Sequence, residues 1–142
     1  MIITENFDIY NAQKLKTGKI GTRGIPLGSG QFRFVVRVII FNQTGDKVLI
    51  QQRQGTKSIF PHFWDFTASG GVQAGELLHE AATRELLEET GIFYDFSNMP
   101  SRLTIQFHEG WSEVFVIQKN ILLKDLTLQK SEVSAMRWVS ED

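Results

Sequence analysis

The chain of 142 residues contains no cysteine, and this absence removes several kinds of chemistry at once. Disulfide bonds, cysteine-ligated zinc and thiol nucleophiles are all excluded. Basic residues are not in excess either, because 15 Lys and Arg stand against 16 Asp and Glu and give a formal net charge of −1. A protein that grips nucleic acid carries a positive field, so we expect no nucleic-acid partner.

Long apolar runs are also missing. The N-terminal sequence MIITENFDIYNAQK has neither the basic start nor the apolar core of a secretory signal, and Arg37 interrupts the apolar stretch VVRVIIF. We therefore expect a soluble, cytoplasmic protein without a membrane anchor. With 42% hydrophobic residues the chain can bury a core, and we predict a single domain over residues 1–142. The sequence does not distinguish a monomer from a homodimer.

Alternating apolar residues predict a sheet of many strands. The predicted strands are residues 5–10, 32–42, 47–53, 101–109, 112–118 and 134–140, with a hairpin turn at residues 43–46. The glycine-rich residues 18–30 are expected to form an irregular loop or a twisted hairpin. One helical pattern covers residues 75–90, where Gly91 supplies a C-terminal stop, so the fold class is α/β with a mixed sheet. Ser140 and the acidic residues after it resemble a helix start, and we expect a final C-terminal helix whose body is missing or truncated.

The predicted helix carries three glutamates, Glu85, Glu88 and Glu89, on one arc. With about 3.6 residues per turn, positions i, i+3 and i+4 lie within about 100°, so the three carboxylates converge. Like charges at this spacing destabilise an isolated helix by about 0.2–0.5 kcal/mol per pair unless a cation relieves the repulsion. Arg84 can pair with Glu80 or Glu88, but we expect it to point away from the face that Glu85 and Glu89 share.

A divalent cation is the other way to relieve this repulsion. The cluster offers only hard oxygen ligands, which suit Mg²⁺ better than zinc. The plain alternative is a solvated acidic surface, because charge-rich helix faces are common. The preceding residues favour the metal site: Ser69, Gly70 and Gly71 form a turn whose backbone can approach a ligand closely, and Glu76 falls in the expected first helical turn.

Turn and helix together match one known motif, the Nudix box, over residues 70–92. Its pattern G-x5-E-x7-R-E-U-x-E-E-x-G-U, where U is bulky and aliphatic, is matched by Gly70, Glu76, Arg84, Glu85, Leu86, Glu88, Glu89, Gly91 and Ile92. Nine specified positions would coincide by chance in roughly one window per billion. The chain therefore resembles Nudix hydrolases. Outside the box, less specific matches such as FDIYN, TRGIPL and EVSAMRWVS are similar to the branch near isopentenyl-diphosphate isomerase.

This resemblance implies an α/β/α sandwich around a mixed sheet, with a loop–helix–loop that binds Mg²⁺ or Mn²⁺. It also implies hydrolysis of a nucleoside diphosphate linked to another group, or of a related small pyrophosphate. By position, Glu85 and Glu89 would be the principal metal ligands and Glu88 a further one. Ser69 or Gly70 would add a backbone carbonyl.

The resemblance also implies that Arg84 orients the glutamates and that Glu76 assists through an ion pair with Arg84. It leaves the general base open, because the family shares the box but varies the base. The candidates are Glu85, Glu88, Glu109, Glu113 and Glu132. For the last three, the ordinary interpretation is a surface or strand-end acid.

Other residue types offer weaker candidates. The three histidines lack partners at ligand spacing and are expected to be structural: His62, His79 and His108. Four aromatic residues are candidates for stacking on a base, although aromatic residues more often lie in a core: Phe60, Phe63, Trp64 and Trp111. Four basic residues are candidates for phosphate contacts, with a solvated loop as the alternative: Lys14, Lys16, Lys19 and Arg23.

Two other functions remain to be weighed. The outer matches suggest an isomerase of isopentenyl diphosphate, but that reaction, as the resemblance implies it, uses a cysteine opposite a glutamate, and the chain has no cysteine. A catalytically silent domain that binds a nucleotide as a sensor is the other, and the complete set of box glutamates argues against it. The sequence does not identify the substrate, because the loops around the box choose the group that is cleaved.

Overall fold

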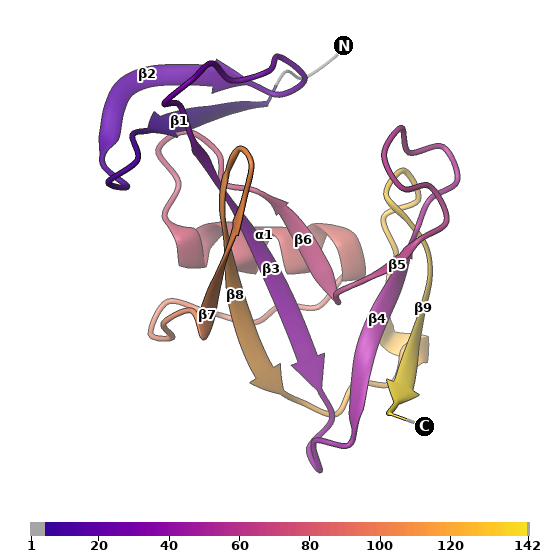
Figure 1. The fold of residues 1–142 in the computed structure, drawn as a ribbon. Coiled ribbons are helices and arrows are strands. Elements are labelled where there is room, and N and C mark those ends of the chain that lie inside the picture. The colour runs from indigo at the N-terminus through magenta and orange to yellow at the C-terminus, as the bar shows by residue number, and fades with distance from the viewer. Residues whose placement is uncertain (1–4, 142) are drawn as a thin grey trace.

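The computed structural model describes residues 5–141, and within them the strands form two sheets (Figure 1). The smaller sheet is an antiparallel hairpin of β1 (Asn6–Tyr10) and β2 (Lys16–Thr22). The larger sheet has the order β5-β4-β3-β8-β7, while β6 also pairs with β3 and β9 with β4. Its strands are β3 (Arg33–Phe41), β4 (Lys47–Arg53), β5 (Trp64–Asp65), β6 (Ala68–Gly71), β7 (Leu103–Phe107), β8 (Gly110–Gln118) and β9 (Val133–Ser140).

The larger sheet is mixed, because β3 and β8 run parallel while the other paired strands run antiparallel. Helix α1 (Leu78–Thr90) packs against one face and lies behind β3 and β6 in Figure 1. Alternate residues of β3, such as Val36 and Val38, are fully buried in one core cluster with Ala82 and Leu86 of α1. This alternation is the period-two pattern that the sequence shows, and the predicted α/β arrangement is confirmed.

Helix α1 begins three residues later than the sequence predicts. Gly75 has a φ of 79° and Leu77 is extended, so neither continues a helix. The Leu77 N–H donates to the Glu80 carboxylate at 2.8 Å, which closes the first turn. Glu76 consequently lies in the loop and not in the first helical turn. Gly91 ends the helix in the left-handed conformation, as predicted.

The sequence did not predict three of the strands, which are β2, β5 and β6. The twisted-hairpin interpretation of residues 18–30 is correct only for β2, and the residues after it are irregular. β5 and β6 are two and four residues long, too short for a periodic pattern to reveal. A short 3₁₀ helix, η1 (Leu123–Asp125), precedes β9. Ser140 is the last residue of β9, and Asp142 lies outside the described residues, so the final helix stays a prediction.

No helix within residues 5–141 has the length and apolar character needed to span a membrane.

Candidate active site

The glutamates of α1 lie where β4 separates from β3. β4 pairs with β3 at only two positions, and β6 pairs with β3 along Val35–Val38 instead. Glu89 sits at this separation and is held from both sides. The Ser69 N–H of β6 donates to its carboxylate oxygens at 3.2 and 3.3 Å, and Gln51 Nε2 of β4 donates at 3.2 Å.

Burial distinguishes the three glutamates from one another. Glu85 is 7% exposed and Glu89 is 4% exposed, whereas the Glu88 side chain is 45% exposed. Burial raises the pKa of Glu85 to about 7, against the lowering effect of Arg84. Burial also raises the pKa of Glu89 to about 8, with a further contribution from the negative charge of Glu85. Burial therefore favours the protonated forms of these two carboxyl groups more than it would for solvated acids.

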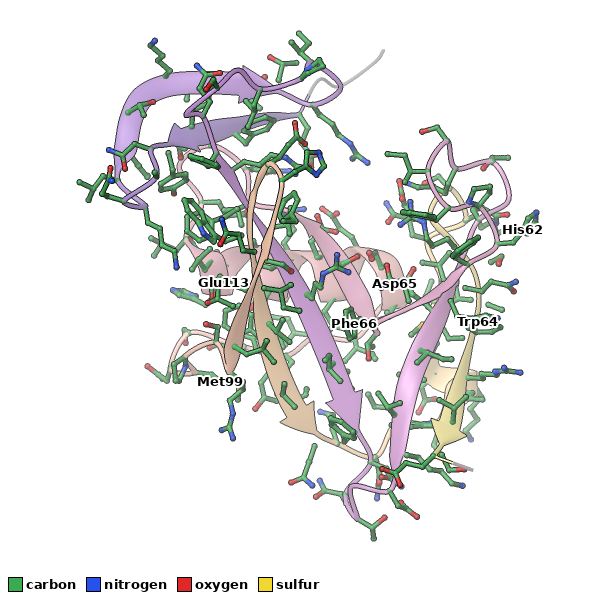
Figure 2. All side chains as sticks on the ribbon, in the orientation of Figure 1. His62, Trp64, Asp65, Phe66, Met99 and Glu113 are labelled. Carbon is green, nitrogen blue, oxygen red and sulfur yellow. The ribbon has the colours of Figure 1, made fainter. Side chains whose placement is uncertain are left out.

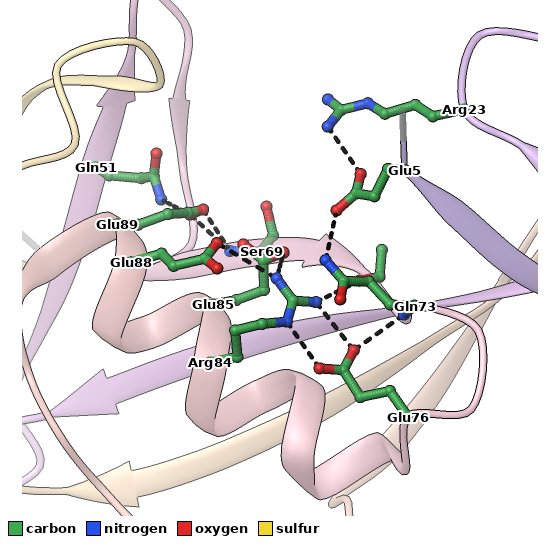
Figure 3. Close-up of polar contacts among 11 residues, drawn as sticks. Glu5, Arg23, Gln51, Ser69, Gln73, Glu76, Arg84, Glu85, Glu88 and Glu89 are labelled. Atoms are coloured by element: carbon green, nitrogen blue, oxygen red, sulfur yellow. Dashed lines mark hydrogen bonds and ion pairs between the residues drawn. The ribbon is translucent and has the colours of Figure 1, made fainter. Parts of the chain in front are cut away.

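Arg84 lies between Glu76 and the other acids (Figure 3). Its Nε and Nη2 donate to Glu76 at 2.7 and 3.0 Å, and its Nη1 donates to Glu85 at 2.8 Å and to Glu88 at 3.3 Å. The Gly71 carbonyl accepts a further bond at 3.0 Å. Burial by itself lowers the pKa of Arg84, but the bonds to Glu76 and the attraction of Glu85 raise it above its usual value. The expectation that Arg84 points away from Glu85 is thus wrong, because Glu76 and Gly71 bend the side chain back across the helix.

The carboxylates do not converge as the helical spacing predicts. Within residues 5–141, no three Asp, Glu or His side chains lie close enough to hold one metal ion. Arg84 draws Glu85 and Glu88 toward itself, while Glu89 turns to Ser69 and Gln51. The spacing places the residues on one helix, but these partners set where each carboxylate points.

The donor chemistry of the pocket nevertheless fits a hard cation. Its two buried carboxylates have raised pKa values, so an ion that supplies positive charge can replace the protons. Gly70 leaves space for one of them, since a Cβ there would lie 2.1 Å from the Glu85 carboxyl carbon. Gly71 has nothing within 4 Å of a Cβ, and neither glycine has a positive φ. Within the protein itself, the steric requirement for glycine is therefore at Gly70, and no special backbone conformation is required at either position.

The candidate bases outside the box lie in different places. Glu109 pairs with Arg33 at 3.2 Å in the turn between β7 and β8. Glu113 lies along β8 (Figure 2) and accepts bonds from two hydroxyls of the β7 side, at 2.6 and 2.9 Å. Glu132 belongs to the segment beside the end of α1. In this segment the Gln129 N–H donates to the Glu89 carbonyl at 3.1 Å, and the Glu132 N–H donates to the Gln129 carbonyl at 2.9 Å. Of these three acids, Glu132 is the one whose segment is hydrogen-bonded to α1 and whose charge contributes to the raised pKa of Glu89.

Lys57 and Gln51 contact acidic residues, and the sequence pattern indicated neither of them. Lys57 forms an ion pair with Glu132 and its side chain is only 14% exposed. Gln51 also donates to the Thr67 carbonyl at 3.1 Å, which holds its amide toward Glu89. Neither residue belongs to the motif, and each meets its partner across a long stretch of sequence, Lys57 with Glu132 and Gln51 with Glu89.

The weaker candidates fall mostly outside this pocket. Trp111 is 7% exposed and packs in the core, so it is not free to stack on a base. Phe60 and Phe63 are exposed and contact each other, with ring centroids 5.1 Å apart. The His62 ring covers Gly55 so closely that a Cβ on Gly55 would lie 2.4 Å from it, which supports a structural role. The exposed basic residues lie on the β1–β2 hairpin or directly after it: Lys14, Lys16, Lys19 and Arg23.

A family model of the NUDIX domain matches residues 31–142. The chain belongs to the Nudix hydrolase family. An uncharacterised Nudix hydrolase of Listeria monocytogenes is 40% identical over 138 residues, which cover 97% of this chain and 81% of that protein. Nudix hydrolase 3 of Arabidopsis thaliana is 31% identical over 147 residues, which cover 95% of this chain and 19% of that protein.

The solved structures agree with this membership at the level of the fold. The crystal structure of DR0079 from Deinococcus radiodurans has a TM-score of 0.79 at 22% identity, and the match covers 96% of this chain and 83% of that one. The predicted α/β/α class is confirmed, and the described residues include its sheet and one helical layer. As a Nudix hydrolase the protein is an enzyme of a family that hydrolyses nucleoside diphosphate derivatives, acts on small molecules and generally needs divalent cations.

Proposed function

We propose that this Nudix hydrolase cleaves a pyrophosphate linkage in a nucleoside diphosphate derivative or a related organic pyrophosphate, with Mg²⁺ as its cation and Mn²⁺ as a substitute. The observation that carries the proposal is the pair of buried carboxylates, Glu85 and Glu89, with pKa values raised to about 7 and about 8. A buried acid without a compensating charge destabilises a fold, and a cation is the compensation that also serves phosphate chemistry.

In this proposal Glu85, Glu88 and Glu89 hold the cation, with the carbonyl of Ser69 or Gly70 nearby. When bound, the cation offsets phosphate charge and acidifies a water molecule. The protein's own part is to position its ligands. Arg84 contacts two of the three glutamates, and its bonds to Glu76 anchor it to the loop before α1.

The contacts described above favour Glu132 as the general base over Glu109 and Glu113. It belongs to the segment that is hydrogen-bonded to the end of α1, and its negative charge contributes to the raised pKa of Glu89. Its ion pair with Lys57 restrains the carboxylate. A base acts when its carboxylate reaches the attacking water directly or through one further water, which this location permits.

The test is product analysis on a panel of nucleoside di- and triphosphates, dinucleoside polyphosphates, nucleotide sugars and coenzymes with Mg²⁺. We expect one class to be cleaved at its pyrophosphate linkage, with activity removed by EDTA and restored by Mg²⁺ or Mn²⁺. A nucleotide that binds tightly with Mg²⁺ but is never cleaved would favour the sensor alternative. Cleavage that is unaffected by EDTA would contradict the metal-dependent mechanism.

A further inference from the structure

An arginine–aspartate pair lies beside the glutamates without holding any of them. Arg37 Nη1 donates to Asp65 Oδ1 at 3.3 Å, and Arg37 Nε donates to the Ser112 hydroxyl at 2.9 Å. The guanidinium also lies over the Phe66 ring, 5.3 Å from its centroid. Arg37 is in the middle of β3, on the face turned away from α1, because the residues on either side of it are buried against α1. Figure 2 shows Asp65 and Phe66 where β5 leads into β6.

The sheet register connects this pair to Glu89. Arg37 is the register partner of Ser69 on β6, and Asp65 is the register partner of Gln51 on β4. Ser69 and Gln51 are the two residues that donate hydrogen bonds to the Glu89 carboxylate. Paired residues of neighbouring strands lie about 5 Å apart. The register therefore places Arg37 and Asp65 beside the two residues that hold the Glu89 carboxylate, which are Ser69 and Gln51.

The pair also has hydrogen-bonding capacity left for a ligand. An arginine has five N–H donors, and the contacts above use two of those of Arg37. Asp65 Oδ1 also accepts from the Phe66 N–H, while Oδ2 accepts no bond from residues 5–141. The two side chains are 32% and 23% exposed, so a ligand can reach them. Because their charges cancel, they offer donors and an acceptor side by side without a net charge.

We propose that Arg37 and Asp65 are specificity-determining residues that bind the part of the substrate beyond the scissile linkage. The chemistry that fits them is a flat, neutral group with donors and acceptors on one edge, such as a nucleobase. A further phosphate fits less well, because the Asp65 carboxylate repels it. A site of this kind discriminates strongly between ligands. A ligand that lacks the matching edge leaves the polar groups of the site without hydrogen-bond partners. This inference rests on the proposed function for one point, that the phosphates lie at the glutamates of α1.

The experiment compares two probes in the presence of Mg²⁺: nucleoside diphosphates with each of the common bases, and inorganic pyrophosphate, which has no base. Calorimetry gives the dissociation constants for the wild-type protein and for Arg37→Met, Arg37→Lys and Asp65→Asn. We expect Arg37→Met and Asp65→Asn to weaken the best-bound nucleoside diphosphate by about tenfold or more and to leave pyrophosphate within about twofold. Arg37→Lys should behave like Arg37→Met, because an ammonium lacks the planar fork.

Arg33 provides the matched control. It lies four residues away on the same strand and face, pairs with Glu109 at 3.2 Å and stacks over the Phe107 ring at 5.3 Å. Arg33→Met therefore removes an equivalent arginine–carboxylate pair at a distance from Glu89, and it should bind both probes as the wild type does. Thermal melts of all variants report whether any has lost its fold.

Three outcomes would overturn the inference. One is unchanged binding of every nucleoside diphosphate by Arg37→Met. Another is equal weakening of both probes by Arg37→Met with recovery in Arg37→Lys, which would make Arg37 a phosphate contact. The third is the same loss in Arg33→Met. A wild-type protein that binds both probes but cleaves no pyrophosphate linkage would contradict the proposed function instead, and the variants would still decide the role of the pair.

Discussion

At the scale of single residues, burial distinguishes Glu85 and Glu89 from the acids of a solvated helix surface. Glu85 and Glu89 are 7% and 4% exposed, so they are not the solvated acids that a charge-rich helix face would present. A buried carboxylate is costly in its charged form unless it gains a proton, a cation or several hydrogen-bond donors. Glu89 has donors from Ser69 and Gln51, yet its pKa stays raised. The pocket is therefore one in which positive charge is favourable.

The first prediction concerns Glu89→Gln. In EDTA above about pH 8, where both carboxylates are charged, the variant should be as stable as the wild type or more stable by roughly a few tenths of a kcal/mol, because it lacks the repulsion from Glu85. With excess Mg²⁺ the order should reverse, since a ligand that binds only the folded state stabilises in proportion to its occupancy. Turnover should fall by orders of magnitude. Thermal melts in EDTA and in Mg²⁺, together with an assay on the best substrate, measure all three effects. Wild-type turnover and an unchanged Mg²⁺-dependent shift in the variant would show that Glu89 is not a ligand.

The second prediction is a pH dependence with a defined sign. The pKa values of Glu85 and Glu89 rise from 4.5 to about 7 and about 8 in the folded protein, so the folded state binds more protons than the unfolded state between these values. The contribution of these groups to stability is complete below pH 4.5 and is lost as the pH rises toward 8. Denaturant unfolding in EDTA at several pH values should show this loss in the wild type and a smaller loss in Glu89→Gln. An equal loss in both proteins would contradict the assignment to Glu89.

At the scale of elements, the glycine turn of β6 and the start of α1 act as one unit. The Glu85 carboxyl occupies the space where a Cβ of residue 70 would be, whereas residue 71 has free space around it. The same turn supplies the Gly71 carbonyl to Arg84 and the Ser69 N–H to Glu89. The strand is four residues long, but three of those residues contact the charged groups of the helix.

The third prediction uses this difference between neighbouring glycines. Gly70→Ala should displace Glu85 and lower turnover at least about tenfold, because a Cβ contact near 2 Å cannot be tolerated without movement. Gly71→Ala should keep most of the activity, since its φ is not positive and its Cβ meets no atom. Both variants should show the far-UV circular dichroism of the wild type. Equal kinetics in the two variants would remove the steric role of Gly70.

The fourth prediction concerns the segment that leads into β9. Glu132→Gln should lower turnover by about a hundredfold or more, the range typical of a lost general base, while Mg²⁺ still raises the melting temperature. Glu109→Gln is the control, because Glu109 pairs with Arg33 in the turn between β7 and β8. It should keep near-wild-type turnover. If Glu132→Gln stays active and only Glu85 or Glu88 variants fail, the base belongs to α1 itself.

At the scale of the whole molecule, the amino-acid composition limits which reactions the protein can catalyse, because a residue type that is absent cannot take part. The fifth prediction is that the protein does not isomerise isopentenyl diphosphate, because it has no cysteine to serve opposite a glutamate. Incubation with isopentenyl diphosphate and Mg²⁺ should produce no dimethylallyl diphosphate by chromatography. Its appearance would contradict the reaction class, and hydrolysis of the same compound would not.

The sequence by itself determined the family, the α/β class and the identity of the acidic residues. These features are local: the Nudix box lies within residues 70–92, and a helix of known pitch relates its positions to one another. The alternation along β3 and the stop at Gly91 are equally local, and both were predicted. β5 and β6 escaped prediction because strands of two and four residues carry no period.

Only the tertiary structure decided the surroundings of each of these acids. It buried Glu85 and Glu89 and left Glu88 exposed, and it turned Arg84 onto Glu85 against the expectation from helical geometry. It also brought Gln51 of β4 and Glu132 of the segment before β9 to the end of α1. Burial, pKa and hydrogen-bond direction depend on neighbours from distant parts of the chain. Those neighbours meet only when β4, β6 and α1 pack together.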